Sequence, residues 1–479
     1  MTNETIDIKL SIELQQAITT DQAWHYHIVP KQTEQNSITF YTDPDHFKES
    51  FKDELEMLLG KKINVELING ADIQRALGSF YRRNVPTAKK QSKQFSGKSD
   101  DFLVSLIMEA KNLSSSDIHI ELYEEKCRVR FRIDGLLIER YIINKNDYPS
   151  LINKVKIKAD LNISEKRLPQ DGRILFNHEG MKFDIRVSVL PTLHGEKIVL
   201  RLLSKDATNI DINLLGFSES EISSYLEGVK KPHGIILISG PTGSGKTTTL
   251  YATLKLLNKE KTNILTIEDP IEYTLEGINQ VQLREDIGLT FARALRTFLR
   301  QDPDVIMLGE IRDSETAQMA IRAALTGHLV LSTIHTNSAW GTISRLVDMG
   351  VPSFLLANTI NLSVAQRLLR ILCPECKEEQ ALMAGELPRT FKPRKEISSH
   401  FISKGCDHCH YTGFKGRRAV YEVLPIDQEL SEKIKANQFD ISAWLEERNI
   451  RTLKDNAFDV FHKGETSLEE VYPILLNDF

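Results

Sequence analysis

The sequence predicts an α/β protein whose core is a parallel sheet carrying a phosphate-binding loop, flanked by smaller modules. The stretch Gly240-Pro241-Thr242-Gly243-Ser244-Gly245-Lys246-Thr247 matches the pattern Gly, four residues, Gly-Lys, then Ser or Thr. The apolar run 235–239 before it is typical of a buried parallel strand, and residues 248–257 after it can continue as a helix. Two more apolar runs, 305–308 and 329–334, predict further strands of the same sheet.

The chemistry of this loop follows from its backbone. Glycines let the chain approach a phosphate closely, where a Cβ would collide. The loop N–H groups and the start of the helix then face the anion. Lys246 supplies a charge for the β- and γ-phosphates, and the Thr247 hydroxyl a ligand for magnesium. The alternative is a glycine-rich turn that binds nothing.

Length and composition set the limits of this interpretation. A chain of 479 residues is expected to fold as two to four domains. A net charge of −5 is not the signature of a nucleic-acid-binding protein, and no apolar run is long enough to span a bilayer. The polar, acidic N-terminus does not read as a signal peptide, so we expect a cytosolic protein. In that compartment, five cysteines favour a metal site over disulfides.

Residues 1–81 are expected to form a small α/β docking domain. Strands are predicted over 24–29, 37–41 and 63–68, and helices over 45–59 and 70–81. The segment 82–98 has six basic residues and no acidic ones, which favours a solvated flexible linker. The alternative is a basic strip that contacts anionic lipid.

Residues 99–205 predict a second domain with an antiparallel sheet. Helices are expected over 101–112 and 148–159, and strands over 117–121, 127–133, 174–176, 183–189 and 196–202. Asp134-Gly135 is a hairpin turn signal. Arg186 and Arg201 lie in predicted strands, either as paired surface charges or as cations reaching a phosphate held by another domain or subunit.

From residue 206 onward, carboxylates follow the predicted core strands. Glu268 and Asp269 end the strand 263–267, and Glu310 follows the strand 305–308. The carboxyl ends of parallel strands border the ligand crevice. Glu310 is expected to orient or deprotonate the attacking water, and the alternative is a surface salt bridge with Arg312. The usual magnesium-binding aspartate is Gly309 here, so magnesium would rely on Thr247, waters and the Glu268/Asp269 pair.

A histidine and four cysteines complete the candidate residues. His335 ends the strand 329–334, where it either senses the γ-phosphate or is a satisfied polar residue. Cys373 and Cys376 are separated by two residues, as are Cys406 and Cys409. Such pairs predict a closed tetrahedral zinc site with an architectural role, and the alternative is four unligated thiols. Helices, including 443–448 and 468–476, are expected to end the chain.

Four blocks of this sequence resemble the ATPases that drive type II secretion and type IV pilus assembly. They are GPTGSGKTTTLY, TIEDPIEY, RQDPDVIMLGEIRD and TGHLVLSTIHTNSA. The block SEKRLPQDGR and the cysteine pairs are similar to the same family's N-terminal subdomain and zinc insert. The resemblance runs from about residue 115 to the end, and more loosely over residues 20–81. Retraction motors of the superfamily lack the four-cysteine insert, so the resemblance favours an assembly motor.

The resemblance implies a RecA-like P-loop NTPase core over 206–479, with a zinc insert at 372–418 and C-terminal helices. A PAS-like α+β domain would precede it at 99–205. ATP, Mg²⁺ and Zn²⁺ are the implied cofactors, and a homohexamer on the cytoplasmic face of the inner membrane is the implied assembly. Membrane-platform and cytoplasmic-domain proteins would bind through residues 1–98. The implied nucleotide-site residues are Gly240 to Thr248, Glu268, Asp269, Glu310 and His335, and Arg186, Arg201, Arg296, Arg300 and Arg312 would reach phosphates or neighbouring subunits.

Two alternative functions remain at this point. One is a zinc-ribbon nucleic-acid-binding protein that uses ATP only as a structural ligand. The other is a ring ATPase that moves DNA. Salt-dependent nucleic-acid binding without hydrolysis would support the first, and DNA-stimulated hydrolysis the second.

Overall fold

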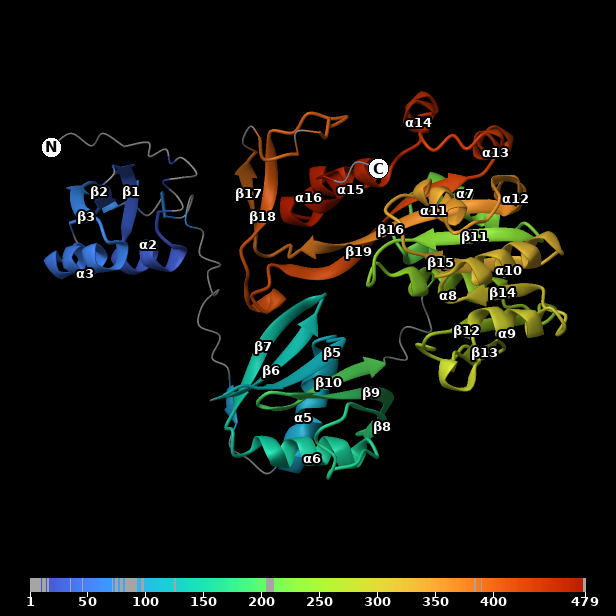
Figure 1. The fold of residues 1–479 in the computed structure, drawn as a ribbon, viewed down its shortest axis with the longest axis horizontal. Coiled ribbons are helices and arrows are strands. Elements are labelled where there is room, and N and C mark those ends of the chain that lie inside the picture. The colour runs from blue at the N-terminus through green and yellow to red at the C-terminus, as the bar shows by residue number, and fades with distance from the viewer. Residues whose placement is uncertain are drawn as a thin grey trace. The chain divides into compact units, whose positions relative to one another are not determined.

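The computed structural model describes most of residues 10–81, then 93–95, 99–203 and 211–476, with short gaps at 11–13, 15–16, 35, 45, 71, 74–75, 78–80, 125, 383–384 and 389. The predicted linker 82–98 therefore lies largely outside the described residues. The chain divides into two compact units, residues 1–91 and 92–479. Figure 1 shows the elements of each unit along the chain.

The first unit is a three-stranded sheet in the order β1-β2-β3 with helices packed on it. Its elements are α2 (Thr20–Tyr26), β1 (Ile28–Thr33), β2 (Ser37–Thr42), α3 (Glu49–Leu59) and β3 (Lys62–Leu67). The strand pair β1/β2 is antiparallel and β2/β3 is parallel. The predicted helix 70–81 lies partly outside the described residues.

The strand predicted over 24–29 is wrong. Thr19 caps α2 by a reciprocal pair of hydrogen bonds with Gln22, and this capping box starts a helix in that segment. The helix ends at His27, whose φ of 55° is left-handed. The strand therefore begins only at Ile28. The alternating apolar residues Trp24, Tyr26 and Ile28 had predicted a strand, but the capping box stabilises a helix over the first two of them.

The second unit contains two seven-stranded sheets. The first has the order β4-β7-β6-β5-β10-β9-β8, and all its pairs are antiparallel except β4/β7. Helices α5 and α6 pack on one face of this sheet (Figure 1). The elements are β4 (Lys93–Phe95), α5 (Ser99–Asn112), β5 (Asp117–Leu122), β6 (Cys127–Ile133), β7 (Leu136–Ile143), α6 (Tyr148–Lys158), β8 (Gln170–His178), β9 (Met181–Thr192) and β10 (Gly195–Leu203).

The second sheet has the order β13-β12-β14-β15-β11-β16-β19, and only the edge pair β16/β19 is antiparallel. Its strands are β11 (Gly234–Ser239), β12 (Ile264–Glu268), β13 (Asn279–Gln282), β14 (Val305–Leu308), β15 (Leu329–Ile334), β16 (Ile360–Leu372) and β19 (Phe414–Pro425). The predicted strands 235–239, 305–308 and 329–334 are confirmed as three of its central members.

Helices cover both faces of this sheet. Ile235 and Leu237 of β11 belong to one core cluster, whereas Ile236 and Ile238 belong to the other. Both faces are thus buried, which explains why these strands read as continuous apolar runs. One face carries α7 (Glu219–Val229) and α8 (Lys246–Leu257). The other carries α9 (Phe291–Phe298), α10 (Ser314–Leu325), α11 (Gly341–Asp348), α12 (Ser353–Thr359), α13 (Gln428–Lys435), α14 (Ser442–Glu447), α15 (Leu453–His462) and α16 (Leu468–Leu476).

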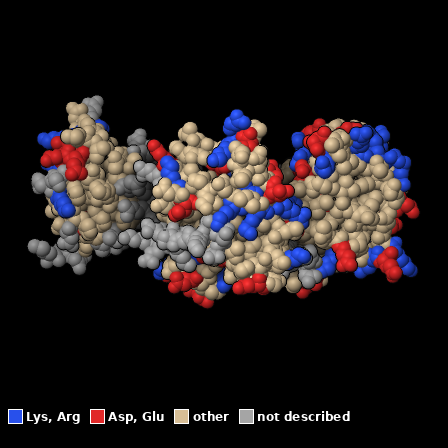
Figure 2. All heavy atoms as spheres, turned by 90° about the horizontal axis from the view of Figure 1, so that it is seen from below, with Lys and Arg blue, Asp and Glu red and all other residues tan. Residues whose placement is uncertain are grey.

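A small two-stranded sheet, β17 (Lys377–Ala381) with β18 (Ser399–Ser403), lies between β16 and β19 in the chain. Short 3-10 turns occur at Ile212–Leu214, Glu285–Ile287 and Asp407–Cys409. Among the described residues, no helix is both long enough and apolar enough to cross a bilayer. On the face drawn in Figure 2, basic and acidic side chains lie interspersed among other residues.

Candidate active site and metal centre

The phosphate-binding loop connects β11 to α8, as its sequence predicts. Gly240, Gly243 and Gly245 have φ angles of 149°, 82° and 88°, a region that residues with a Cβ rarely adopt. A Cβ on Gly240 would lie 2.5 Å from the carbonyl oxygen of Gln366 on β16, whereas a Cβ on Gly243 would meet nothing within 4 Å. The loop is therefore packed tightly at its start and open at its middle.

The charged and hydroxyl groups of the loop fit a magnesium-bound triphosphate. The Lys246 ammonium donates to the carbonyls of Gly240 (2.8 Å) and Pro241 (3.0 Å). Burial lowers the pKa of Lys246, and the charge of Glu310 opposes this effect. Thr247 is exposed in the first turn of α8. Ser244 Oγ is buried, and no hydrogen-bond partner is found for it among the described residues. A bound phosphate would supply the missing anion and acceptors.

Glu310 lies in a charged cluster at the carboxyl edge of the core sheet. Its carboxylate forms an ion pair with the Arg312 guanidinium and lies 3.3 Å from Nε2 of His335. Arg312 also lies 3.5 Å from Asp269. The Glu310 side chain is only 15% exposed. The structure thus brings together residues that follow three different strands, β12, β14 and β15, and the Glu310–Arg312 pair coexists with the contact to His335.

Gly309 has a packing reason to replace the expected aspartate. A Cβ at this position would lie 3.3 Å from the carbonyl oxygen of Ile267 and 3.4 Å from Cα of Glu268. Contacts this short are tighter than about nine in ten Cβ contacts in proteins. A side chain at residue 309 would therefore push against the end of β12.

Glu268 is placed differently from Asp269. It is buried at 3% exposure and accepts hydrogen bonds from Thr266 Oγ1 (2.6 Å), from Gln280 Nε2 (3.0 Å) and from the Tyr251 hydroxyl. Burial, together with the charge of Glu268, raises the pKa of Tyr251. The Glu268 carboxylate therefore connects Tyr251 of α8 to the end of β12. Asp269, in contrast, is partly exposed beside Arg312.

The four other predicted arginines have protein partners. Arg201 Nε lies 2.9 Å from Asp117 Oδ1, which corresponds to the paired-charge interpretation. Arg186 donates to the Ile271 carbonyl and lies 3.5 Å from Glu272, in the segment after Asp269. A crevice of about 860 Å³ borders Arg186 and residues 270–276. Arg296 pairs with Glu315 of α10, and Arg300 donates to the Arg296 carbonyl at 3.0 Å.

Sequence reasoning missed Gln366 and Arg367, which lie next to the loop on β16. Gln366 is buried, donates to the Ser244 carbonyl (2.8 Å) and accepts from Thr249 Oγ1 (2.9 Å). Arg367 donates to the Gln366 and Asn337 carbonyls, both at 3.0 Å, and burial lowers its pKa. No local signal marks these two residues, because their place beside the loop depends on the pairing of β16 (Ile360–Leu372) with β11.

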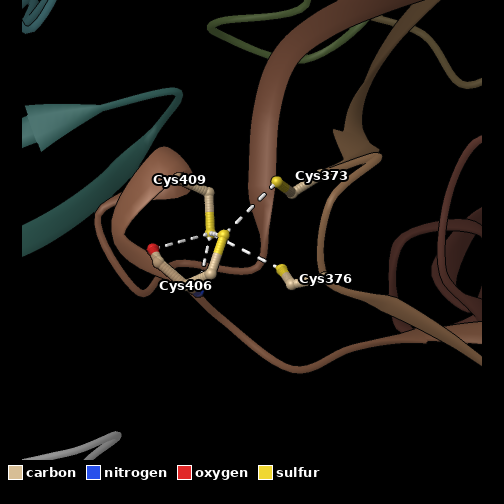
Figure 3. Close-up of side chains that lie close together, drawn as sticks. All are labelled: Cys373, Cys376, Cys406 and Cys409. Atoms are coloured by element: carbon tan, nitrogen blue, oxygen red, sulfur yellow. Dashed lines mark hydrogen bonds between the residues drawn. The ribbon is translucent and has the colours of Figure 1, made fainter.

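The four predicted cysteines converge on one point (Figure 3). The Sγ–Sγ distances are 3.8 Å for Cys373–Cys406, 3.7 Å for Cys376–Cys409 and 3.8 Å for Cys406–Cys409. Zinc–sulfur bonds of about 2.3 Å in a tetrahedron separate the sulfurs by about 3.8 Å. The donor set and spacing are therefore consistent with a closed zinc site. Cys127, the fifth cysteine, is buried elsewhere, as expected.

Backbone N–H groups point at these sulfurs. Gly405 N lies 3.3 Å from Cys376 Sγ, and Cys406 N and Gly413 N each lie 3.2 Å from Cys409 Sγ. Such donors stabilise thiolates. The φ of Gly413 is 77°, and a Cβ there would lie 2.4 Å from Cβ of Ser403. Glycine is therefore required at this turn.

The fold and this edge of the sheet define the class of P-loop nucleoside triphosphatases. A family model described as "Type II/IV secretion system protein" matches residues 95–473. The chain belongs to that family, and it is an ATPase of the secretion and pilus assembly type.

Relatives and solved structures agree with this assignment. The chain is 41% identical over 433 residues to the type II secretion system ATPase E of Vibrio cholerae, covering 84% of this chain and 86% of the relative. It is 43% identical over 451 residues to the type IV pilus assembly ATPase PilB of Myxococcus xanthus, covering 88% and 79%. The pilus retraction motor PilT with bound ADP superposes with a TM-score of 0.53 at 28% identity, covering 78% of this chain and 96% of that chain.

Proposed function

We propose that this protein hydrolyses ATP at the loop Gly240–Thr248 to power the assembly of pseudopili or pili. The observation that carries the proposal is the cluster of Glu310, Arg312 and His335 at the sheet edge that also holds Lys246. A carboxylate beside a phosphate loop supplies the base that hydrolysis needs. The same edge contributes cations that can balance the charge developing on the transferred phosphoryl group.

The mechanism uses groups whose present contacts can be exchanged. Lys246 would leave the carbonyls of Gly240 and Pro241 and bind the β- and γ-phosphates. Glu310 would accept a proton from the attacking water, and His335 would lie beside the γ-phosphate. Thr247 and Asp269 are the residues that would hold magnesium, with Glu268 fixing Asp269 from beneath. Magnesium supplies charge neutralisation of the β- and γ-phosphates when bound.

The proposal for the wider assembly is supported by the family assignment. We propose a homohexamer in which the RecA-like core, residues 206–479, hydrolyses ATP and the PAS-like domain, residues 99–205, transmits the movement. Arg186, Arg201, Arg296 and Arg300 would exchange their present partners for phosphates or residues of a neighbouring subunit. The zinc insert 372–418 would be architectural.

The proposed location is the cytoplasmic face of the inner membrane. Residues 1–81 would dock onto platform and cytoplasmic-domain proteins of the machine, and residues 82–98 would serve as a flexible linker whose six basic residues are available to acidic lipid. Stimulation of ATP hydrolysis by vesicles with acidic lipid, and not by DNA, is the expected result. Stimulation by DNA alone would favour a DNA-moving ring ATPase instead.

The variant Glu310→Gln tests the catalytic assignment. It keeps the size of the side chain but removes the base, so kcat should fall by about 10²- to 10⁴-fold. The Kd for ATP should stay within about threefold of the wild-type value, because Lys246 and the loop are untouched. The matched control is Glu315→Gln, which alters an exposed glutamate on α10 paired with Arg296. An unchanged kcat in Glu310→Gln would remove Glu310 from its role.

A further inference from the structure

The N-terminal unit contains a second cluster of metal-binding side chains, His27, Asp43 and His46. One ligand atom from each residue lies within 4.8 Å of the other two. Nδ1 of His27 lies 2.8 Å from Asp43 Oδ2, and Nδ1 of His46 lies 2.8 Å from Asp43 Oδ1. The family match begins only at residue 95, so it does not cover this cluster.

Three pieces of local structure hold these donors in place. His27 is the left-handed residue that ends α2, and its carbonyl accepts a hydrogen bond from Thr42 Oγ1 at 2.8 Å. Asp43 follows directly after β2, and the backbone N–H of His46 donates to Asp43 Oδ1 at 3.0 Å. The cluster therefore joins the end of α2 to the turn between β2 and α3.

Two of the three side chains are buried, so the site is preformed in the folded unit. The side chains of His27 and Asp43 are 11% and 2% exposed. The His46 side chain is 55% exposed, so solvent reaches one side of the cluster. The donors of His27 and Asp43 are thus fixed in the interior, and His46 provides the third donor from the solvent side. An ion would enter past His46 and keep one position open to water.

The two imidazole rings stack with centroids 4.0 Å apart and an interplanar angle of 17°. This arrangement points both Nδ1 atoms at the same carboxylate. If both rings were protonated, two positive charges would face each other at this distance, which is unfavourable. A single divalent ion between the two nitrogens and the carboxylate would balance the buried charge of Asp43 without that repulsion.

The donor set selects the class of ion. Two neutral imidazoles and one carboxylate suit zinc and its neighbours in the first transition series, whereas magnesium and calcium prefer oxygen ligands. Bonds of about 2.0 Å in a tetrahedron separate the ligand atoms by about 3.3 Å. The two nitrogens now contact different oxygens of Asp43, each at 2.8 Å, so zinc binding would turn the carboxylate to offer one oxygen and move the three ligand atoms to separations of about 3.3 Å.

We propose that His27, Asp43 and His46 form a zinc-binding site in the N-terminal unit, separate from the cysteine cluster and independent of ATP hydrolysis. The bound ion clips the end of α2 to the turn before α3. It would thereby set the orientation of α3 within the unit.

The test is a zinc titration of the full-length protein whose cysteine cluster already holds one equivalent. Calorimetry, with metal counting after gel filtration, should show a second equivalent in the wild type. The variants His46→Ala and Asp43→Asn should bind that equivalent at least about tenfold more weakly. Each variant is compared with its own zinc-free melting temperature, because His46→Ala also removes a contact to the buried Asp43 carboxylate. Added zinc should raise the melting temperature of the wild type and not of the two variants.

Two controls separate this site from its surroundings. His25→Ala removes an exposed histidine two residues from His27, and it should keep the second equivalent. Cys376→Ser should lose the first equivalent and keep the second. A carboxylate that simply accepts hydrogen bonds from two neutral imidazoles would give the same distances without an ion. The proposal fails if the wild type binds no second zinc equivalent at free zinc up to about 0.1 mM. It also fails if His46→Ala binds the second equivalent with the affinity of the wild type.

Discussion

Replacing Gly240 with alanine tests how the phosphate-binding loop is held. The new Cβ would lie 2.5 Å from the Gln366 carbonyl oxygen and 2.7 Å from Ser244 Oγ, at a φ of 149°. The Gln366 carbonyl cannot retreat easily, because the Gln366 side chain is bonded to both Ser244 and Thr249 and its strand pairs with β11. The substitution must therefore distort either the loop or β16.

The expected magnitude combines two costs. Backbone strain contributes about 1–3 kcal/mol, and overpacking against a fixed neighbour contributes about 1–3 kcal/mol. A loss of about 3 kcal/mol shifts the melting temperature of a domain of this size by about 6–12 °C. The control is Gly243→Ala, whose Cβ meets nothing within 4 Å and whose φ is 82°. It pays only the conformational cost of about 1–2 kcal/mol.

The assay is differential scanning calorimetry without nucleotide, followed by titration with a fluorescent ATP analogue. Gly240→Ala should melt well below Gly243→Ala and bind the analogue more weakly. If the two variants melt at the same temperature, the Gln366 carbonyl is not a fixed wall and the reasoning fails.

Three further predictions concern other parts of the molecule. Burial alone would raise the pKa of Glu121, but hydrogen bonds, with that from Arg130 the strongest, lower the pKa to about 2. Glu121 therefore stabilises the fold above pH 4.5, and this contribution is lost as the pH falls towards 2. Glu121→Gln should cost about 3 kcal/mol at pH 7, and melting curves of both proteins should converge as the pH drops through this range. Gln366→Leu should raise the Kd for ATP about tenfold in equilibrium titrations, because it leaves the Ser244 carbonyl without its donor. Cys376→Ser should reduce zinc in the purified protein by one equivalent by elemental analysis and lower its melting temperature, while wild-type levels of zinc would exclude the cysteine site.

Local sequence signals predicted the loop because its geometry depends on neighbouring residues. Glycines at 240, 243 and 245 adopt the positive φ angles that the motif requires. The cysteine pairs were predictable for the same reason, since two-residue spacing brings both sulfurs to one turn. The apolar runs predicted β11, β14 and β15 within one residue of their bounds.

Properties that depend on the order of the strands were not predictable. Glu268 and Asp269 are adjacent in sequence, yet one is buried beneath the loop and the other lies beside Arg312. The sequence Glu268-Asp269 does not indicate which of the two side chains is buried. The contribution of Gln366 likewise depends on β16 pairing with β11 across more than a hundred residues.

The strand order also explains why Glu310 and the loop can cooperate. In the sheet, β15 lies between β11 and β14, so the strand that leads into the loop and the strand that Glu310 follows are about 10 Å apart. The registers align Ser239 with Ile334 and Leu308 with Ser332, and beyond this pairing the Ile311 N–H donates to the Thr333 carbonyl at 2.9 Å. Glu310 therefore lies close to the end of β15, which His335 follows directly.

His335, at the end of the strand between β11 and β14, contacts Glu310. The charge of Glu310 also acts on Lys246, where it opposes the lowering of the Lys246 pKa by burial. The central position of β15 thus brings a carboxylate, a histidine and a lysine to one edge of the sheet, as the proposed mechanism requires, although they follow three different strands.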